Sequence, residues 1–412
     1  MNILKYIKMS AMVGALALTT ACDNDDFGPS IFPEVSDEPD PASYTYKFDK
    51  WCNENFRDIY NLDFKYKMED VEADMNYNLV PATYTQARDI CLLTKYLWFD
   101  AYKEHYLEMN PGKLVDGKPI TGAEFLMQYG PRILHLVGSP AYNPNTGTEI
   151  LGLAEGGLKV TLFKVNEMNV TDINQMNEYY FRTMHHEFGH ILHQTISYPV
   201  EFNELSTGRY DDSSWQSKAI GYVASLGFIT PYASSQARED FAETIANYFT
   251  RSDDAMELIK WMASQGWTTE DADDPDAVDD PGEEKTYYAR YYFPDESNPN
   301  EKVYFLTSME KDWTNRPCII GEKGETMYTV AEVEQYLENF AAKRTIYAVD
   351  DKDTCDGLAI IERKQQIARE WFKETWGLDF DRLREIVQRR QADFDIDALR
   401  AEVEAIPDPV VK

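Results

Sequence analysis

Positive charge is scarce in this chain of 412 residues. Aspartate and glutamate number 72 against 40 lysines and arginines, which gives a formal net charge of −32. This surplus of acidic groups argues against nucleic acid and anionic membrane surfaces as partners, and it favours solubility outside the cell. The composition narrows the range of partners but does not indicate a substrate.

Cysteine is scarce as well. The chain has five, and no two of them form a Cys-x-x-Cys pair, which argues against a cysteine zinc site. Export would allow disulfides among the four cysteines that follow Cys22, in three alternative pairings that the sequence does not distinguish. Cys52 and Cys91 lie among apolar, helix-like positions, where buried thiols are an equal alternative.

The apolar run near the N-terminus, residues 9 to 18, is too short to span a bilayer and is typical of a signal peptide. It leads to Thr19-Thr20-Ala21-Cys22, which resembles a bacterial lipobox, although Leu18 stands one place further from the cysteine than usual. We expect residues 1–21 to be a lipoprotein signal peptide and Cys22 to carry the lipid anchor, which would hold the chain stably at a membrane.

Residues 22–43 are acidic and proline-rich, and we expect an extended tether there. Asp23-Asn24-Asp25-Asp26 resembles the acidic export signal of surface-exposed lipoproteins. This resemblance implies an outer-membrane lipoprotein that is exposed on the cell surface.

Histidine is rare, but four of the six histidines lie between residues 185 and 193. The frame His186-Glu187-Phe188-Gly189-His190 matches the His-Glu-x-x-His signature of zinc hydrolases. Residues four apart share one face of a helix, so both imidazoles can reach one metal ion, with Glu187 beside the position of a metal-bound water. Apolar residues at three- or four-residue intervals before the motif predict the helix that it needs, with Thr171 or Asp172 as its N-cap. The alternative is a surface helix whose polar residues happen to fit.

A hydrolytic zinc ion takes three protein ligands and one water. The metzincin pattern fails because Ile196 stands where its third histidine belongs. His193 is within reach of the same face, but a third ligand so close on one helix would strain the geometry. We therefore expect His193 to line the pocket or to form a hydrogen bond nearby.

A second predicted helix carries Glu239 and Glu243 four residues apart on one face, with Ser234 or Ser235 as its cap. Such carboxylates repel each other in water, and a cation between the two helices would remove that repulsion. One carboxylate would bind zinc while the other accepts a hydrogen bond from a ligand imidazole. A solvated acidic face is the alternative, and spacing alone does not decide between them.

The histidine motif and Glu239-Asp240-Phe241-Ala242-Glu243 together resemble the gluzincin metallopeptidases, especially the catalytic domain of anthrax lethal factor. A wider set of motifs across residues 42–252 is similar to the substrate-import-associated zinc metallohydrolase lipoproteins. These motifs are Phe48-Asp49-Lys50-Trp51, Asn78-Leu79-Val80-Pro81, Gly138-Ser139-Pro140-Ala141-Tyr142-Asn143, Leu153-Ala154-Glu155-Gly156-Gly157 and Gly227-Phe228-Ile229-Thr230-Pro231-Tyr232-Ala233-Ser234.

The resemblance implies that zinc is bound by His186, His190 and Glu239, and that Glu243 orients a ligand histidine. It implies hydrolysis of a peptide or protein substrate, in which Glu187 moves the protons of a zinc-bound water and Tyr232 hydrogen-bonds the oxyanion. It also implies that residues 158–165 form the sheet edge that holds an extended peptide. The partners it implies are a TonB-dependent outer-membrane nutrient importer and its surface binding lipoprotein.

Two other functions stay open. One is a zinc amidohydrolase that acts on glycoconjugates, since the site does not name its substrate. The other is a non-catalytic surface substrate-binding lipoprotein with a retained zinc site. The intact Glu187 argues against the latter, because structural zinc sites usually close the fourth position with a protein ligand.

We expect an α+β fold with a zincin-like metallopeptidase core and a small sheet, plus helical N- and C-terminal portions. The predicted catalytic region spans residues 44–265. An acidic insertion, disordered in part, follows at residues 266–299. A helical C-terminal lobe is predicted for residues 300–412.

Overall fold

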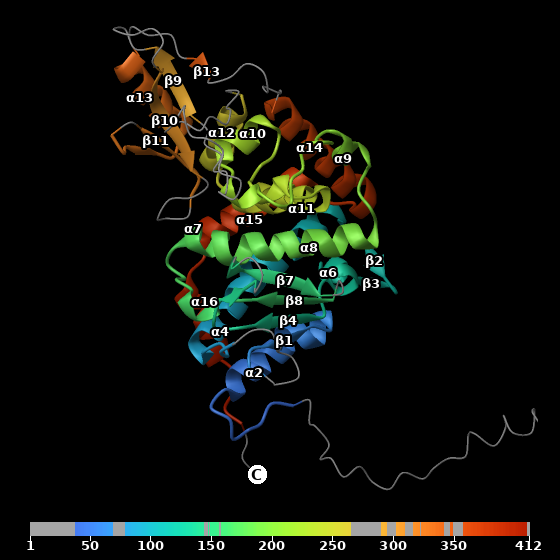
Figure 1. Cartoon of the computed structure of the whole chain (residues 1–412). Coiled ribbons are helices and arrows are strands. Elements are labelled where there is room, and N and C mark those ends of the chain that lie inside the picture. The colour runs from blue at the N-terminus through green and yellow to red at the C-terminus, as the bar shows by residue number, and fades with distance from the viewer. Residues whose placement is uncertain are drawn as a thin grey trace, which may run out of the picture. The chain divides into compact units, whose positions relative to one another are not determined.

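The computed structural model describes residues 38–68, 79–143, 147, 149–155, 158–264, 290–294, 302–309, 316–321, 323–341, 347–348 and 357–409 (Figure 1). The chain divides into two units, residues 1–43 and residues 44–412, and every helix and strand named below belongs to the second. The predicted lipidation site Cys22 lies outside the described residues, as do residues 266–289 of the predicted acidic insertion.

A four-stranded mixed sheet lies against the helix that bears the histidine motif. Its strand order is β1-β4-β8-β7. β1, β4 and β8 run parallel, and β7 pairs antiparallel with β8, so that Gly152 faces Leu162. The four strands are β1 (Asp63–Lys65), β4 (Ile133–Leu136), β7 (Gly152–Glu155) and β8 (Lys159–Leu162).

The edge of this sheet differs from the sequence-based expectation. Residues 158–165 were expected at the edge, but β8 lies between β4 and β7, and β7 is the edge strand. The short, glycine-containing run of β7 carries little strand pattern, and tertiary pairing with β8 decides its conformation. Gly152 permits a close approach to the neighbouring helix, because a Cβ there would lie 2.2 Å from Thr183 Cγ2.

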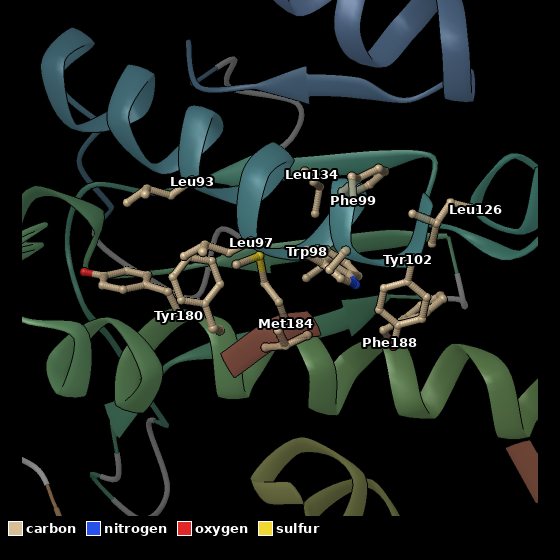
Figure 2. Close-up of a cluster of buried hydrophobic side chains, with 14 of the residues drawn as sticks. Leu93, Leu97, Trp98, Phe99, Tyr102, Leu126, Leu134, Tyr180, Met184 and Phe188 are labelled. Carbon is tan, nitrogen blue, oxygen red and sulfur yellow. The ribbon is translucent and has the colours of Figure 1, made fainter. Parts of the chain in front are cut away.

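A long helical stretch packs beside the helix that bears the histidine motif and shares one core with this sheet. It consists of α4 (Tyr84–Leu93), the π-helical η2 (Thr94–Phe99) and α5 (Asp100–Met109). Figure 2 shows Trp98 and Tyr102 of this stretch facing Met184 and Phe188 of α8 (Arg182–Thr195). The ring centroids of Trp98 and Phe188 are 5.5 Å apart. Burial of each such side chain contributes roughly 1.5–3 kcal/mol, so this core positions α8 firmly.

The two cysteines predicted in apolar positions are buried thiols. Cys52 ends α2 (Tyr46–Cys52) and Cys91 lies in α4; both are free, with their Sγ atoms 3.5 Å apart. Of the two alternatives that the sequence left open for these cysteines, a disulfide or buried thiols, the structure has the buried thiols.

α11 (Ala237–Thr250) lies alongside α8, and both belong to the main core (Figure 1). The approach is close where Gly189 meets Ala242, since a Cβ on Gly189 would lie 3.5 Å from Ala242 Cα. Phe241, Ile245 and Phe249 turn the apolar face of α11 into the core, as the sequence predicts. α11 also contacts two helices near the C-terminus, α14 (Gly357–Trp371) and α15 (Phe380–Asp393).

Residues 300–409 contain strands as well as the predicted helices. The second sheet has the strand order β12-β11-β10-β9-β13. Its strands are β9 (Arg290–Pro294), which falls in the predicted acidic insertion, and β10 (Lys302–Met309), β11 (Cys318–Gly321), β12 (Thr326–Met327) and β13 (Tyr347–Ala348). The helices after residue 300 are α13 (Val330–Ala341), α14 (Gly357–Trp371), η7 (Phe372–Trp376), α15 (Phe380–Asp393) and α16 (Ile396–Glu404).

α14 anchors this C-terminal part to α11. Buried Lys364 lies 2.6 Å from the buried carboxylate of Asp240 on α11 and donates to Gly227 O at 2.8 Å. Ile367 and Trp371 join the main core. α14 therefore supports α11 from the side opposite α8.

Of the remaining elements, α12 (Asp253–Ala263) has 11 residues and the others are short. The short helices are η1 (Asn53–Arg57), α3 (Asp58–Tyr60), α6 (Glu124–Tyr129), η3 (Val165–Glu167), α7 (Ile173–Met176), η4 (Asn177–Phe181), α9 (Glu201–Glu204), η5 (Trp215–Ser217), α10 (Ile220–Ser225) and η6 (Tyr232–Ser234). The short strands form the pairs β2–β3 (Leu114–Val115, Lys118–Pro119) and β5–β6 (Ala141–Tyr142, Glu149–Ile150). Among the described residues, no helix is long and apolar enough to cross a membrane.

Candidate metal centre

The histidine motif lies on α8, as predicted. The helical segment that leads into it begins with α7, where Asp172 is the N-cap and accepts from the backbone N–H groups of Asn174 and Gln175. π-helical η4 joins α7 to α8. His186, Glu187 and His190 are all buried, with 7 to 8 % of each residue exposed. The i, i+4 spacing places both imidazoles on one face of α8.

The cap predicted for the second helix is wrong. α11 begins at Ala237 after Gln236, whose side chain makes no capping hydrogen bond. The hydroxyls of Ser234 and Ser235 instead donate to Pro231 O and Tyr232 O, both at 2.7 Å, within the turn that contains η6. Because these hydroxyls bond to the backbone of their own turn, they do not cap the start of α11.

Glu239 meets both imidazoles. Its Oε2 lies 3.2 Å from His186 Nε2 and 3.0 Å from His190 Nε2, and the two Nε2 atoms are 3.0 Å apart. Glu239 itself is buried, with 8 % exposed. The structure therefore brings the three predicted ligands together, and these three form a group able to hold one metal ion.

The ring nitrogens that face away from this point have their own partners. His186 Nδ1 lies 2.9 Å from Glu243 Oε1, and His190 Nδ1 lies 2.8 Å from His193 Nε2. An ionised carboxylate only accepts, so His186 donates to Glu243 through Nδ1, and its Nε2 faces Glu239. Metal binding would displace the protons on the Nε2 side, so that three lone-pair atoms, the two Nε2 atoms and Glu239 Oε2, face one point.

That donor set fits a zinc ion. Two neutral imidazoles and one carboxylate, with a fourth position left for water, are the ligands of hydrolytic zinc sites such as the His₂Glu type. The carboxylate behind His186 is the usual partner that holds a ligand imidazole in its tautomer. We conclude that the residues present here are suited to Zn²⁺.

Neighbouring charged groups shift the pKa values of His186 and Glu239 strongly. Burial alone would lower the pKa of His186, but its hydrogen bonds to Glu239 and Glu243 outweigh this effect and raise that pKa to about 10. Burial would raise the pKa of Glu239, but the two histidines hold it well below its usual range. The protein thus concentrates negative charge where a cation would sit.

Glu243 is itself held rigidly. Its Oε2 accepts from Thr230 Oγ1 at 2.7 Å and from Asn247 Nδ2 at 3.1 Å. Thr230 Oγ1 also accepts from the backbone N–H of Ala233 at 3.1 Å, in the turn that carries Tyr232. A single buried threonine therefore links the carboxylate that supports His186 to the segment that presents the tyrosine.

Tyr232 lies against the metal site. Its ring centroid is 5.7 Å from that of His186 and 4.8 Å from that of Trp215. Burial raises the pKa of the Tyr232 hydroxyl most, and Glu239 and Glu243 raise it further, so the hydroxyl keeps its proton. The charge of Glu187 also contributes to the raised pKa of both His186 and Tyr232.

One supporting contact was expected from the sequence and two, those of Asn247 and Thr230, were not. His193 was expected to line the pocket or to hydrogen-bond nearby, and the structure makes it the partner of His190 Nδ1. Asn247 lies one turn after Glu243, so i, i+4 spacing was a usable signal. Thr230 had no such signal, because it reaches Glu243 through a loop.

Comparisons with known proteins agree with this site. The family model described as "Putative zinc-binding metallo-peptidase" matches residues 42–278. No curated protein matches the chain significantly. A crystal structure of a putative zinc-binding metallo-peptidase from Bacteroides caccae ATCC 43185 is 29 % identical, with a TM-score of 0.53, and the match covers 89 % of this chain and 99 % of that one.

The match to a solved structure agrees with the predicted α+β fold, which is confirmed. The family model covers more than half of the chain and includes both helices of the metal site. The chain therefore belongs to the family of putative zinc-binding metallo-peptidases.

Proposed function

We propose that this protein is a zinc-dependent metallopeptidase that hydrolyses peptide bonds. The observation that carries the proposal is the convergence of His186, His190 and Glu239 on one point, with Glu187 next to it on α8. A structural metal site has no use for a buried carboxylate in that position. Membership of the metallo-peptidase family supports the same reaction.

His186, His190 and Glu239 would hold the ion. A bound Zn²⁺ supplies a Lewis acid that lowers the pKa of a water and polarises the substrate carbonyl. Glu187 takes a proton from the attacking water and later delivers it to the leaving amine. Its burial places the carboxylate away from bulk water, where proton transfer to the substrate is direct.

Tyr232 supplies a hydrogen bond to the oxyanion that forms at the carbonyl. Its raised pKa keeps the hydroxyl protonated, and contact with the His186 ring holds it beside the site. The link from Thr230 to Ala233 N positions the turn that carries it. Such a donor typically contributes roughly 3 kcal/mol to the stabilisation of a transition state.

β7 is the element suited to bind an extended peptide. Within the described residues it pairs with β8 on one side only, and it lies against α8. A peptide added along its other edge would gain main-chain hydrogen bonds with little demand on its sequence. We therefore assign peptide binding to β7 and not to residues 158–165, where the sequence predicted the edge strand.

The Glu187→Gln variant tests the proposal. We expect it to bind one zinc per chain, measured by mass spectrometry of metals, and to lose roughly 10²–10⁴-fold in turnover because the proton carrier is gone. Cleavage is measured on a mixed peptide library, with a glycoconjugate library in parallel. Glu204→Gln, which alters an exposed carboxylate on α9, is the matched control and should keep full activity.

Three outcomes would contradict the proposal. Undiminished cleavage by Glu187→Gln would remove Glu187 from the reaction. Cleavage of glycoconjugates without cleavage of peptides would assign another zinc hydrolase. Zinc binding by the wild-type protein without turnover on either library would assign a binding protein.

We further propose that the protein is an outer-membrane lipoprotein, anchored through Cys22 and associated with a TonB-dependent nutrient importer and its surface binding lipoprotein. Support comes from the lipobox-like residues before Cys22 and from the acidic residues after it. Cys22→Ser should move the protein from the membrane fraction to the soluble fraction. Protease treatment of whole cells tests surface exposure, and co-purification from membranes tests the importer.

A further inference from the structure

Lys364 is a buried cation that the proposed mechanism does not use. It lies on α14, which is outside residues 42–278, the part that the family model matches. α14 packs against α10, α11 and α12 (Figure 1). Only 1 % of Lys364 is exposed, and its Nζ lies 2.6 Å from Oδ2 of the fully buried Asp240.

Stability alone is a poor reason for this ion pair. The transfer of two charges out of water costs free energy that their attraction often does not recover. Oδ1 of Asp240 is also buried and has no hydrogen-bond partner among the described residues, which adds to the cost. A charged hydrogen bond does, however, fix the distance and direction between two elements, which apolar contacts leave looser.

The first element that Lys364 holds is α11. Asp240 follows the proposed ligand Glu239 on this helix, and consecutive helical residues point about 100° apart. Glu239 therefore faces the histidines of α8 while Asp240 faces α14. Tyr210 donates to the same Oδ2 of Asp240 at 2.9 Å, so two groups hold the residue next to the ligand.

The second element is the segment that leads to Tyr232. Lys364 Nζ donates to Gly227 O at 2.8 Å and lies 4.3 Å from the centroid of the Phe228 ring. Gly227 approaches α14 closely, because a Cβ there would lie 2.3 Å from Ile360 Cγ2. Ile360 and Lys364 are four residues apart and share one face of α14. This face therefore fixes the start of the segment that presents the tyrosine.

We propose that Lys364 is a positioning residue for the metal centre. It fixes α11 at Asp240 and the following segment at Gly227, so that Glu239 and Tyr232 keep their places relative to each other. α14 is then a component of the site, although none of the three proposed ligands comes from it. The effect of Lys364 on turnover rests on the proposed peptidase function, whereas its effect on the bound metal does not.

Lys364→Met in the full-length protein is the test, because methionine fills a similar volume without a charge or an N–H donor. Competition with a chelator measures the zinc Kd, and the visible absorption of the cobalt(II)-loaded protein reports the ligand geometry. We expect a loss of zinc affinity of about tenfold and a changed cobalt spectrum. On a peptide that the wild type cleaves, kcat should fall about 10–100-fold with little change in KM, since the displaced groups act in the transition state.

A second variant covers a loss of folding. Lys364→Met leaves Asp240 buried without its cation, which is costly. Lys364→Met combined with Asp240→Asn removes both charges, and circular dichroism of the zinc-free proteins shows which variants fold. The double variant should show the same losses, because neutral side chains do not restore the fixed distance between α14 and α11.

Arg363→Met is the matched control. Arg363 precedes Lys364 on α14 but pairs with Glu201 on the surface at 2.7 Å, so its loss removes a cation from the same helix. This variant should keep the wild-type zinc Kd, cobalt spectrum and kcat.

Three results would overturn the proposal. The first is a folded Lys364→Met or double variant with the zinc Kd, cobalt spectrum and kcat of the wild type. The second is an equal loss in Arg363→Met. The third is a failure of both Lys364 variants to fold while Arg363→Met folds, because Lys364 would then serve the fold as a whole. A wild-type protein without turnover would contradict the proposed function alone, and the zinc Kd and cobalt spectrum would still decide the role of Lys364.

Discussion

The two imidazoles of the metal site are supported in different ways. Behind His186 stands Glu243, a buried carboxylate that Thr230 and Asn247 hold by further hydrogen bonds. Behind His190 stands His193, a neutral ring that packs against Tyr198 and Phe241 with centroid distances of 5.5 and 6.2 Å. Burial lowers the pKa of His193 most, and His190 lowers it further, to about 4, so the ring is uncharged at neutral pH.

The two supporting residues therefore affect their imidazoles differently. A charged acceptor raises the basicity of the imidazole it binds, whereas a neutral acceptor mainly sets its orientation. The side of Glu243 also presents Tyr232, through Thr230. The side of His193 presents an aromatic wall formed by Tyr198 and Phe241. We expect changes on the first side to alter metal affinity and chemistry, and changes on the second to alter metal affinity alone.

Loss of Glu239, which both imidazoles share, should have the largest effect. Glu239→Ala removes the one oxygen that contacts both Nε2 atoms, so we expect less than one zinc per chain. The zinc-dependent rise in unfolding free energy should vanish with it; at a thousandfold excess over Kd that rise is about 4 kcal/mol. Metal analysis and thermal unfolding with and without zinc measure both. A stoichiometric zinc content in this variant would contradict the assigned ligand set.

Tyr232→Phe tests whether chemistry is confined to the Glu243 side. The variant should keep its zinc and lose about 10²–10³-fold in kcat, because the oxyanion loses a donor. Tyr198→Phe, on the wall beside His193, is the matched control and should keep kcat within a few-fold. Equal losses in the two variants would remove the distinction between the sides.

Glu243→Gln should weaken zinc binding towards the upper part of the range of roughly 10–100-fold that such supporting residues contribute. The amide keeps the shape of the carboxylate but removes the charge that His186, Thr230 and Asn247 all contact. Competition with a chelator measures the zinc Kd, and circular dichroism checks the fold. An unchanged Kd would show that the carboxylate is not needed for the metal site.

His193→Phe should have the smallest effect, a loss of zinc affinity of about tenfold. Phenylalanine retains the contacts with Tyr198 and Phe241 but cannot accept from His190 Nδ1. His193→Gln restores an acceptor and should recover part of the affinity, while the unfolding free energy of the zinc-free protein should differ little among the variants. A larger effect than that of Glu243→Gln would reverse the comparison.

Parts of the site were predictable because they depend on local geometry. The i, i+4 spacing of His186 and His190 places both rings on one helix face whatever surrounds it. The apolar stripes that turn α8 and α11 into the core follow the same period. The cap of α11 was mispredicted, because the serine hydroxyls bond within their own turn. The edge strand was mispredicted, because the pairing of β7 with β8 depends on the whole sheet.

The sequence by itself determined the acidic character of the protein, the α+β fold and the residues that could bind zinc from α8. Only the tertiary structure decided that Glu239, 49 residues after His190, reaches the same point, and that a carboxylate supports one imidazole while a histidine supports the other. The physical reason is range: helical spacing operates over four residues, whereas the approach of α11 to α8 depends on the packing of a core drawn from the whole chain.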